Sequence, residues 1–497
     1  DVLPPHVGHP RKFDLLIVDE AHNIAPSAGA NYALESQRTR FIRTIGPHFQ
    51  HRLFLTATPH NGYTESFTAL LELLDDQRFA RNILPDEKRL SQVMIRRLKS
   101  DLVDADGNPL YPQRKLQALS IPYTEEERAI HRKLIDYCAS REREDGESGN
   151  AFGTTFINQL LKKRLFSSPA AFASTLEKHL QSLSNETRQK RNDALDERIL
   201  RKAILKAEED YADDREVENA QSEAVEEASR RAQPLSDEQR QILDELRQWA
   251  QRAKNQTDSK AQAILDWLTT NLRPNGEWND CRVILFTEYR TTHQWMHEIL
   301  VSHGFGGDRL AILHGGLSQD DREPVKAAFQ ASPKISPVRI LLATDAASEG
   351  IDLQNHCNCL IHLEIPYNPN VMEQRNGRID RHGQKEKEVL IWHPVDGGPG
   401  SDEQVGGHGE DILRALRKLE SMRADMGSVN PVIAPQMSGL IEGSLTDLDT
   451  RLAEAKIAKA RRFVRAEREL KERVAKLHDR LLATRQDFHL TPEHIQM

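Results

Sequence analysis

A short apolar run that ends in two adjacent carboxylates places the strongest constraint on this chain. Leu15 to Val18 is bounded by polar residues and is followed at once by Asp19 and Glu20. Such a run is typical of a strand buried on both faces of a parallel sheet. The carboxyl end of that strand lies where α/β sheets bind ligands. We expect Asp19 and Glu20 to hold Mg²⁺ and an attacking water there, although acids facing solvent are the ordinary alternative for a lone pair.

Three more stretches follow, and their order supports a functional interpretation of Asp19 and Glu20. Residues 52–59 read Arg-Leu-Phe-Leu-Thr-Ala-Thr-Pro, which predicts a second buried strand ending in hydroxyls. Residues 341–352 read Leu-Leu-Ala-Thr-Asp-Ala-Ala-Ser-Glu-Gly-Ile-Asp, and residues 374–381 read Gln-Arg-Asn-Gly-Arg-Ile-Asp-Arg. With these stretches the chain resembles the superfamily 2 helicases and translocases, whose motifs II, III, V and VI they match in sequence order.

The resemblance implies an ATP site between two lobes. Asp19 and Glu20 would hold magnesium and the attacking water, and His22 would relay the nucleotide state to motif III. Arg378 and Arg381 are three residues apart, which places them on one face of a helix, and they would serve as arginine fingers. The positions that the resemblance assigns to ATP are Asp19, Glu20, His22, Gly350, Asp352, Gln374, Arg378 and Arg381.

The same resemblance implies coupling and nucleic-acid contacts. Thr56 and Thr58 would couple ATP cleavage to movement of the lobes. Gly315 and Gly316 follow a predicted strand, where main-chain amides contact a phosphodiester or simply form a turn. Contacts to the DNA backbone carry no direct base information, which suits a motor indifferent to sequence. The expected nucleic-acid positions are Gly315, Gly316, Thr344, Ser348 and Glu349.

Two further stretches narrow the resemblance to the SNF2-like branch. Residues 94–102 contain Arg-Arg-x-Lys-x-Asp, and Gly383-Gln384 follows the arginines. Together with residues 69–79, residues 94–102 resemble the SNF2-type helicase of bacterial DISARM phage-defence systems. That resemblance implies a DNA-stimulated ATPase working beside other defence proteins. The alternatives are an ATPase that recycles RNA polymerase, which shares the Thr-Ala-Thr-Pro signature, and a non-catalytic scaffold that binds DNA or a partner.

One expected motif is missing from the chain. The phosphate-binding loop Gly-x-x-x-x-Gly-Lys-[Ser/Thr] cradles the ATP phosphates, and the dipeptide Gly-Lys does not occur in the sequence. In the resembled family this loop precedes motif II. We therefore expect the chain alone to turn over little ATP, and we consider an incomplete chain, a second chain that supplies the loop, or a decayed motor. The start at Asp1 inside a domain favours the first.

The predicted fold is α/β, with two RecA-like parallel-sheet lobes of which the first is incomplete. We assign residues 1–116 to the C-terminal half of lobe 1, 117–256 to a helical insertion, 257–396 to lobe 2, and 397–497 to a linker and charged C-terminal helices. Strands alternating with helices in the third range indicate a parallel sheet. The predicted strands there are 283–287, 310–313, 338–344, 360–365 and 389–392, and an exit strand of lobe 1 is predicted at 116–122.

Local signals mark several helices. Ser259 with Gln262, and Ser318 with Asp321, have the spacing of helix-capping pairs. The insertion is rich in Glu, Lys, Arg and Ala, and its acidic run 208–214 is predicted as a solvated helical face or a partly disordered segment, which is usual for charge runs.

Composition excludes some classes of protein. The net charge of −8 among 497 residues argues against one basic surface that coats nucleic acid, although it does not describe a local groove. No apolar run approaches the ~18 residues of a membrane span, and no secretory signal is present. The four cysteines make no disulfide framework, and Cys357-Asn-Cys359 is half a metal site at most, with core packing favoured. We expect a cytoplasmic protein with reduced thiols.

Overall fold

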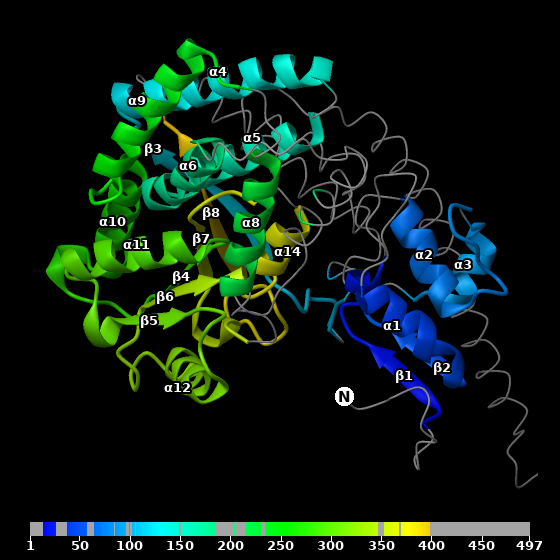
Figure 1. Cartoon of the computed structure of the whole chain (residues 1–497). Helices are drawn as coiled ribbons and strands as arrows, with labels where there is room; N and C mark the ends of the chain where they lie inside the picture. The colour runs from blue at the N-terminus through cyan, green and yellow to red at the C-terminus, as the bar shows by residue number, and fades with distance from the viewer. Residues whose placement is uncertain are drawn as a thin grey trace, which may run out of the picture.

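The chain forms two parallel β-sheets and a bundle of helices that lies beside the larger sheet (Figure 1). This is a computed structural model, and every structural statement below concerns the residues that it describes. These are residues 13–25, 37–56, 64–83, 85–95, 99, 102–104, 106–148, 151–184, 200, 203, 214–229, 234–345, 352–366 and 369–397.

The larger sheet has six strands in the order β3-β8-β7-β4-β6-β5, and every neighbouring pair is parallel. Its central strands β4 and β6 are buried along their whole length, as expected of strands covered on both faces. The strands are β3 (Gln113–Ile121), β4 (Val283–Thr287), β5 (Leu310–Leu313), β6 (Ile340–Thr344), β7 (Cys359–His362) and β8 (Glu388–Asp396).

Helices cover both faces of this sheet, each with its own apolar core. Leu268 and Leu300 belong to the core on one face, and Phe329 and Ile379 to the core on the other. A parallel sheet between two helical layers confirms the predicted α/β fold class. The helices of this region are α10 (Ser259–Leu272), α11 (Arg290–Ser302), α12 (Gln319–Gln330) and α14 (Pro369–Asn376), with short 3-10 turns at Pro274–Gly276, Gly307–Arg309 and Gln354–His356.

The smaller sheet contains β1 (Leu15–Val18) paired in parallel with β2 (His51–Phe54). The prediction that β1 is buried on both faces is wrong for the described residues. Leu15 and Ile17 are 47% and 55% exposed, because no further layer covers that face of the sheet in the described part of the chain. The other elements here are α1 (Gln37–Ile45), α2 (Thr64–Leu74), α3 (Glu87–Val93) and 3-10 turns at Ala21–Ile24 and Gly46–His48.

The residues predicted as a helical insertion form a bundle with a separate apolar core. Leu134, Leu161, Phe172 and Leu243 are fully buried in it, and each comes from a different helix. The bundle packs against α10 and α11, the helices on one side of the larger sheet (Figure 1). Its helices are α4 (Glu125–Ser148), α5 (Ala151–Ser167), α6 (Pro169–Ser184), α8 (Asp214–Ser229) and α9 (Asp237–Ala253).

Two local predictions are corrected. The strand expected to leave lobe 1 is β3, and it pairs along its length with β8 at the edge of the larger sheet, so the predicted boundary at residue 116 falls inside a strand of that sheet. The N-cap of α10 is Asp258, whose carboxylate accepts from the Ala261 amide, whereas the Ser259 hydroxyl donates to Glu127. The other capping pair is confirmed, because Ser318 accepts from the Asp321 amide at 3.2 Å.

No helix in the described part of the chain has the length and apolar character that crossing a membrane requires. The predicted C-terminal helices lie outside the described residues.

Candidate functional site

The acids after β1 lie on a tight turn at the carboxyl end of the smaller sheet. The Glu20 amide donates to Asp19 Oδ1 at 2.9 Å, and the Ala21 amide donates to the Leu55 carbonyl at 2.9 Å. Glu20 adopts φ 46° and ψ 48°, a left-handed conformation that is uncommon for residues other than glycine. Backbone strain of this kind is concentrated at functional sites. The turn leaves both carboxylates accessible at the strand end.

His22 joins this turn to the end of β2. Its Nδ1 lies 3.1 Å from Thr56 Oγ1 and 3.3 Å from Glu20 Oε2. One imidazole therefore contacts both the acid and the threonine that were predicted to act together. Thr58, the other predicted coupling residue, lies outside the described residues.

The pKa of Glu20 is also affected by Arg378, which lies far along the chain. The hydrogen bond from His22 lowers the pKa of the Glu20 carboxyl, burial opposes this, and the positive charges of His22 and Arg378 lower it further. Arg378 is 8% exposed. Arg378, a predicted arginine finger, is thus one of the charges that lower the pKa of the predicted carboxylate.

The two predicted arginine fingers do not share a helix face, contrary to the prediction. α14 ends at Asn376, and Arg378 and Arg381 lie in the turns that follow. Gly377 begins these turns, and an added Cβ there would lie 3.1 Å from the Glu373 carbonyl. The three-residue spacing of the arginines suggested one helix face. The helix ends before Gly377, however, so both arginines lie beyond it.

Arg381 and the other predicted ATP residues have distinct surroundings. Arg381 donates to Asp352 Oδ1 at 2.6 Å, so two predicted residues form an ion pair at the surface. Gln374 is half-buried on α14. Ser348, Glu349 and Gly350 lie outside the described residues.

A buried ionic cluster fixes the turn between the two arginines. Asp380 accepts from Lys99 and from Arg114, and Arg114 also donates to both Glu373 oxygens at 2.7 Å. Burial acts to raise the pKa of Asp380, but the charges of Arg114 and Lys99 outweigh it and hold that pKa below its usual value. Sequence reasoning missed this cluster, apart from Lys99 within the SNF2-like element.

A second buried network anchors α14 to the larger sheet. The Arg375 guanidinium donates to Asp345 at 2.6 and 2.8 Å and to Glu364 at 3.0 Å. Glu364 also accepts from Thr287 Oγ1 and from Ser167 Oγ of α5. The helix before the arginine turn is therefore tied both to the strand ends and to the helical bundle. Sequence reasoning did not single out Arg375, because its partners are strand-end residues distant in sequence.

We expect Asp380→Asn to lower the free energy of unfolding by about 3 kcal/mol, the lower end for breaking a buried ion pair. The effect is at that lower end for two reasons. Arg114 retains its ion pair with Glu373 in the variant, and the Lys99 side chain is 35% exposed to solvent. Urea unfolding of the variant and of Asp136→Asn, an exposed position on α4, measures the difference. Equal stability of the two variants would contradict the role of the cluster.

The same pair of variants gives a pH test. Because the pKa of Asp380 is lowered in the folded protein, its stabilisation is present at pH values above the usual aspartate value of 3.8 and is lost as pH falls through the folded value. The stability difference between wild type and Asp380→Asn is therefore expected to persist at neutral pH and to shrink only below pH 3.8.

The predicted nucleic-acid residues lie at the carboxyl edge of the larger sheet. Gly315 follows β5, and Thr344 ends β6. The Gly315 amide donates to Asp214 Oδ2 at 2.6 Å, and Thr344 Oγ1 donates to the same oxygen at 2.8 Å. Gly316 is exposed. Asp214 is only 4% exposed, so the predicted solvated face is wrong at this residue.

The described residues contain no group of three or more His, Cys, Asp or Glu side chains arranged to hold a metal ion. Cys357 and Cys359 are buried free thiols, which matches the favoured interpretation as core residues. A magnesium ion that arrives with ATP needs few protein ligands, because phosphates and water fill most of its coordination sphere. The exposed Asp19 carboxylate at a strand end fits such a role.

Comparisons with known proteins show which proteins this chain is similar to. Residues 260–383 match the family described as helicase conserved C-terminal domain. The chain is 26% identical over 392 residues to "Uncharacterized ATP-dependent helicase YqhH" of Bacillus subtilis (strain 168), covering 77% of this chain and 55% of that protein. It is 26% identical over 406 residues to "RNA polymerase-associated protein RapA" of Yersinia pseudotuberculosis serotype O:1b (strain IP 31758), covering 77% and 35%. The chain thus spans about half of YqhH and about a third of RapA.

Two solved structures also align with the chain. The C-terminal part of the Fun30 ATPase domain aligns at a TM-score of 0.34 and 16% identity, covering 67% of this chain and 100% of that one. The Pyrococcus furiosus Hef helicase domain aligns at a TM-score of 0.38 and 15% identity, covering 82% and 74%.

Proposed function

We propose that this chain is part of an ATP-dependent DNA translocase, since its helicase C-terminal domain and its relatives support a superfamily 2 helicase of SNF2-like type. The observation that carries the proposal is the influence of the Arg378 charge on the pKa of the Glu20 carboxyl, because the two groups come from the two predicted lobes. A triphosphate between them meets a carboxylate on one side and a guanidinium on the other.

The chemistry asks for positioning and charge stabilisation more than for covalent help. Asp19 would hold magnesium, which when bound neutralises charge on the phosphates. Glu20, kept ionised by His22, orients the attacking water. Arg378 stabilises charge on the transferred phosphoryl group, and Arg381, paired with Asp352, lies next to it in the same turns.

Coupling to DNA runs through contacts at both sheets. The His22 to Thr56 contact links the acid turn to the end of β2, so a change at the nucleotide can shift that strand end. The Gly315 amide and the Thr344 hydroxyl at the larger sheet would contact the DNA backbone, together with Gly316, Ser348 and Glu349. Alternate closing and opening of the lobes would then move the protein along DNA without reading its sequence.

We further propose that another segment or chain supplies the phosphate-binding loop. The sequence lacks that loop, and the face of the smaller sheet formed by Leu15, Ile17 and Leu53 is exposed, with Leu53 at 45%. An exposed apolar sheet face of this kind is suited to packing against further structure. The same segment would complete the nucleotide site beside Asp19.

The biological setting rests on resemblance. Phage defence beside other defence proteins in the cytoplasm is the setting proposed from the DISARM-like stretches. The second candidate is an RNA-polymerase-linked ATPase, favoured by the similarity to RapA. Co-purification of the tagged protein with RNA polymerase from growing cells would favour the second candidate. Protection against phage that is lost with Glu20→Gln would favour the first.

Translocation is tested with the complete protein on two substrates. We expect ATP-dependent displacement of a triplex-forming strand from duplex DNA, and little strand separation of a plain fork, because motors of this type move on duplex DNA. A non-hydrolysable ATP analogue serves as the control for both reactions. Efficient unwinding of the fork would overturn translocation as the activity, and absence of DNA-stimulated hydrolysis would favour a non-catalytic scaffold.

A further inference from the structure

Helix α8 places two carboxylates on the carboxyl edge of the larger sheet. Asp214, its first residue, accepts from the Gly315 amide at 2.6 Å and from the Thr344 hydroxyl at 2.8 Å. Its side chain is therefore held between the ends of β5 and β6. These are the donors that were expected to face a phosphodiester.

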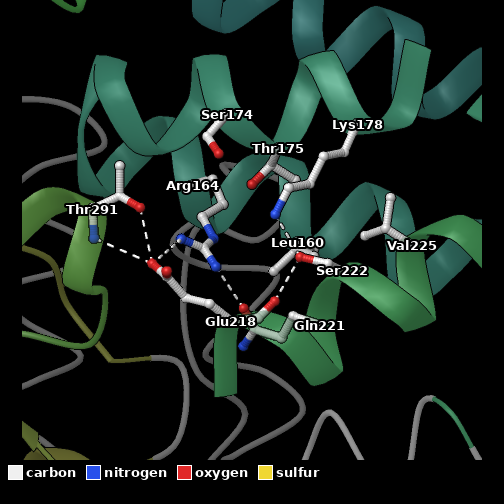
Figure 2. A pocket seen from close by; sticks show the side chains of 10 residues that line it. All are labelled: Leu160, Arg164, Ser174, Thr175, Lys178, Glu218, Gln221, Ser222, Val225 and Thr291. Atoms are coloured by element: carbon white, nitrogen blue, oxygen red, sulfur yellow. Dashed lines mark hydrogen bonds and ion pairs between the residues drawn. The ribbon is translucent and has the colours of Figure 1, made fainter. Parts of the chain in front are cut away.

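Glu218, one helical turn later, makes the matching contact beside β4. Its Oε1 accepts from the Thr291 amide at 3.2 Å and from Thr291 Oγ1 at 2.9 Å, as Figure 2 shows. Thr291 lies in the first turn of α11, whose N-cap residue Tyr289 makes no side-chain capping bond. The positive end of the α11 dipole thus receives a carboxylate from α8.

Two cations contact the same helix, the buried Arg164 and the exposed Lys178. Arg164 donates to Gln221 Oε1 at 2.6 Å and lies 4.0 Å from Glu218 Oε1, and Lys178 donates to Ser222 Oγ at 2.6 Å. Figure 2 shows these side chains converging on α8 from α5 and α6. Main-chain amides, hydroxyls and cations therefore all contact α8. Groups of these kinds are the usual donors to the phosphates of a nucleic-acid backbone.

We propose that α8 is an internal competitor for nucleic acid, whose carboxylates occupy the donors at the strand ends until DNA displaces the helix. This inference rests on the proposed function. Displacement frees the Gly315 amide and the hydroxyls of Thr344 and Thr291 for phosphate oxygens. It also uncovers Arg164, which is buried in the closed form, and releases the exposed Lys178 from its bond to Ser222, so the competing ligand gains contacts to both cations.

The packing of α8 is consistent with a helix that can leave. Its apolar stripe against the bundle consists mainly of Ala220, Ala224 and Ala228, with Val225 beside them. Alanine side chains bury less apolar surface than leucine, so the polar anchors supply a larger share of the hold on α8 than in a leucine-rich helix. Removing the charge of those anchors should therefore shift the balance toward the open form.

The test compares two double variants of the complete protein. Asp214→Asn with Glu218→Gln keeps side-chain size and an acceptor oxygen but removes both charges. Glu216→Gln with Glu223→Gln removes the same charge from exposed positions of the same helix. Fluorescence anisotropy with a labelled DNA duplex should show binding about fivefold or more tighter for the first pair than for the control pair, within the usual range of coupling between sites. DNA should also half-saturate ATP hydrolysis at a correspondingly lower concentration.

Each outcome is decisive. Equal affinity of the two double variants, with normal binding by wild type, would overturn the competitor role and leave the proposed function standing. No DNA binding by any form at low salt would overturn both. Thermal melting reports whether the variants fold. Should the first pair unfold, hydrogen exchange on wild type decides: saturating DNA should speed exchange of the amides of Asp214–Ser229, and unchanged or slower exchange would refute displacement.

Discussion

In the complete protein, Glu20→Gln is expected to reduce the ATP turnover number by roughly 10²–10⁴-fold, the usual contribution of a positioned general base. Nucleotide affinity should change little, because glutamine keeps the size of the side chain and Asp19 retains its place at the strand end. Steady-state ATPase assays with saturating DNA measure turnover, and titration with a fluorescent ATP analogue measures affinity. The largest effect should appear in the turnover number and not in KM.

A matched substitution and a pH profile sharpen this result. Glu298→Gln, at an exposed position on α11, should leave turnover unchanged. The hydrogen bond from His22 is the main cause that lowers the pKa of Glu20 beneath its ordinary value of 4.5. Glu20 therefore stays ionised throughout the neutral range, and protonation of its carboxylate should cost activity only below pH 4.5. Undiminished turnover in Glu20→Gln would exclude the proposed role.

Short apolar strands were predictable because an apolar run bounded by polar residues marks a strand, whether one face or both faces are covered. β1, β4 and β5 begin and end at the residues that the apolar runs indicated. β3 was assigned to the wrong sheet because its own sequence shows a strand but not its partner. Its pairing with β8 joins residues far apart in the chain, which no local pattern records.

The candidate site was predictable where chemistry and spacing coincide in one stretch. Asp19, Glu20 and His22 are adjacent in sequence, and the structure keeps them together with Thr56. The groups that position Arg378 were not predictable, because Asp380 meets Lys99 and Arg114 only in the folded chain. Asp214 shows the same limit: an acid in a charged run reads as solvated, and only tertiary structure reveals its two donors.

Arg378→Ala in the complete protein is expected to lower the turnover number by roughly 10³–10⁵-fold, the range for removal of an arginine finger. Arg378 is buried and lowers the pKa of Glu20, so its charge acts on the carboxylate that is proposed to orient the attacking water. Arg378→Lys should restore only part of the activity, because an ammonium lacks the planar fork of a guanidinium. ATPase assays at saturating ATP and DNA measure each variant.

Controls for this substitution separate catalysis from folding. Arg247→Ala removes an exposed arginine from α9 and should leave turnover unchanged. Loss of Arg378 also removes a positive charge that lowers the pKa of Glu20, so the acid limb of the pH profile should move toward higher pH in Arg378→Ala. A purely structural role would lower the melting temperature without moving that limb. Near wild-type turnover in Arg378→Ala, with the protein folded, would refute the idea that Glu20 and Arg378 act on one triphosphate.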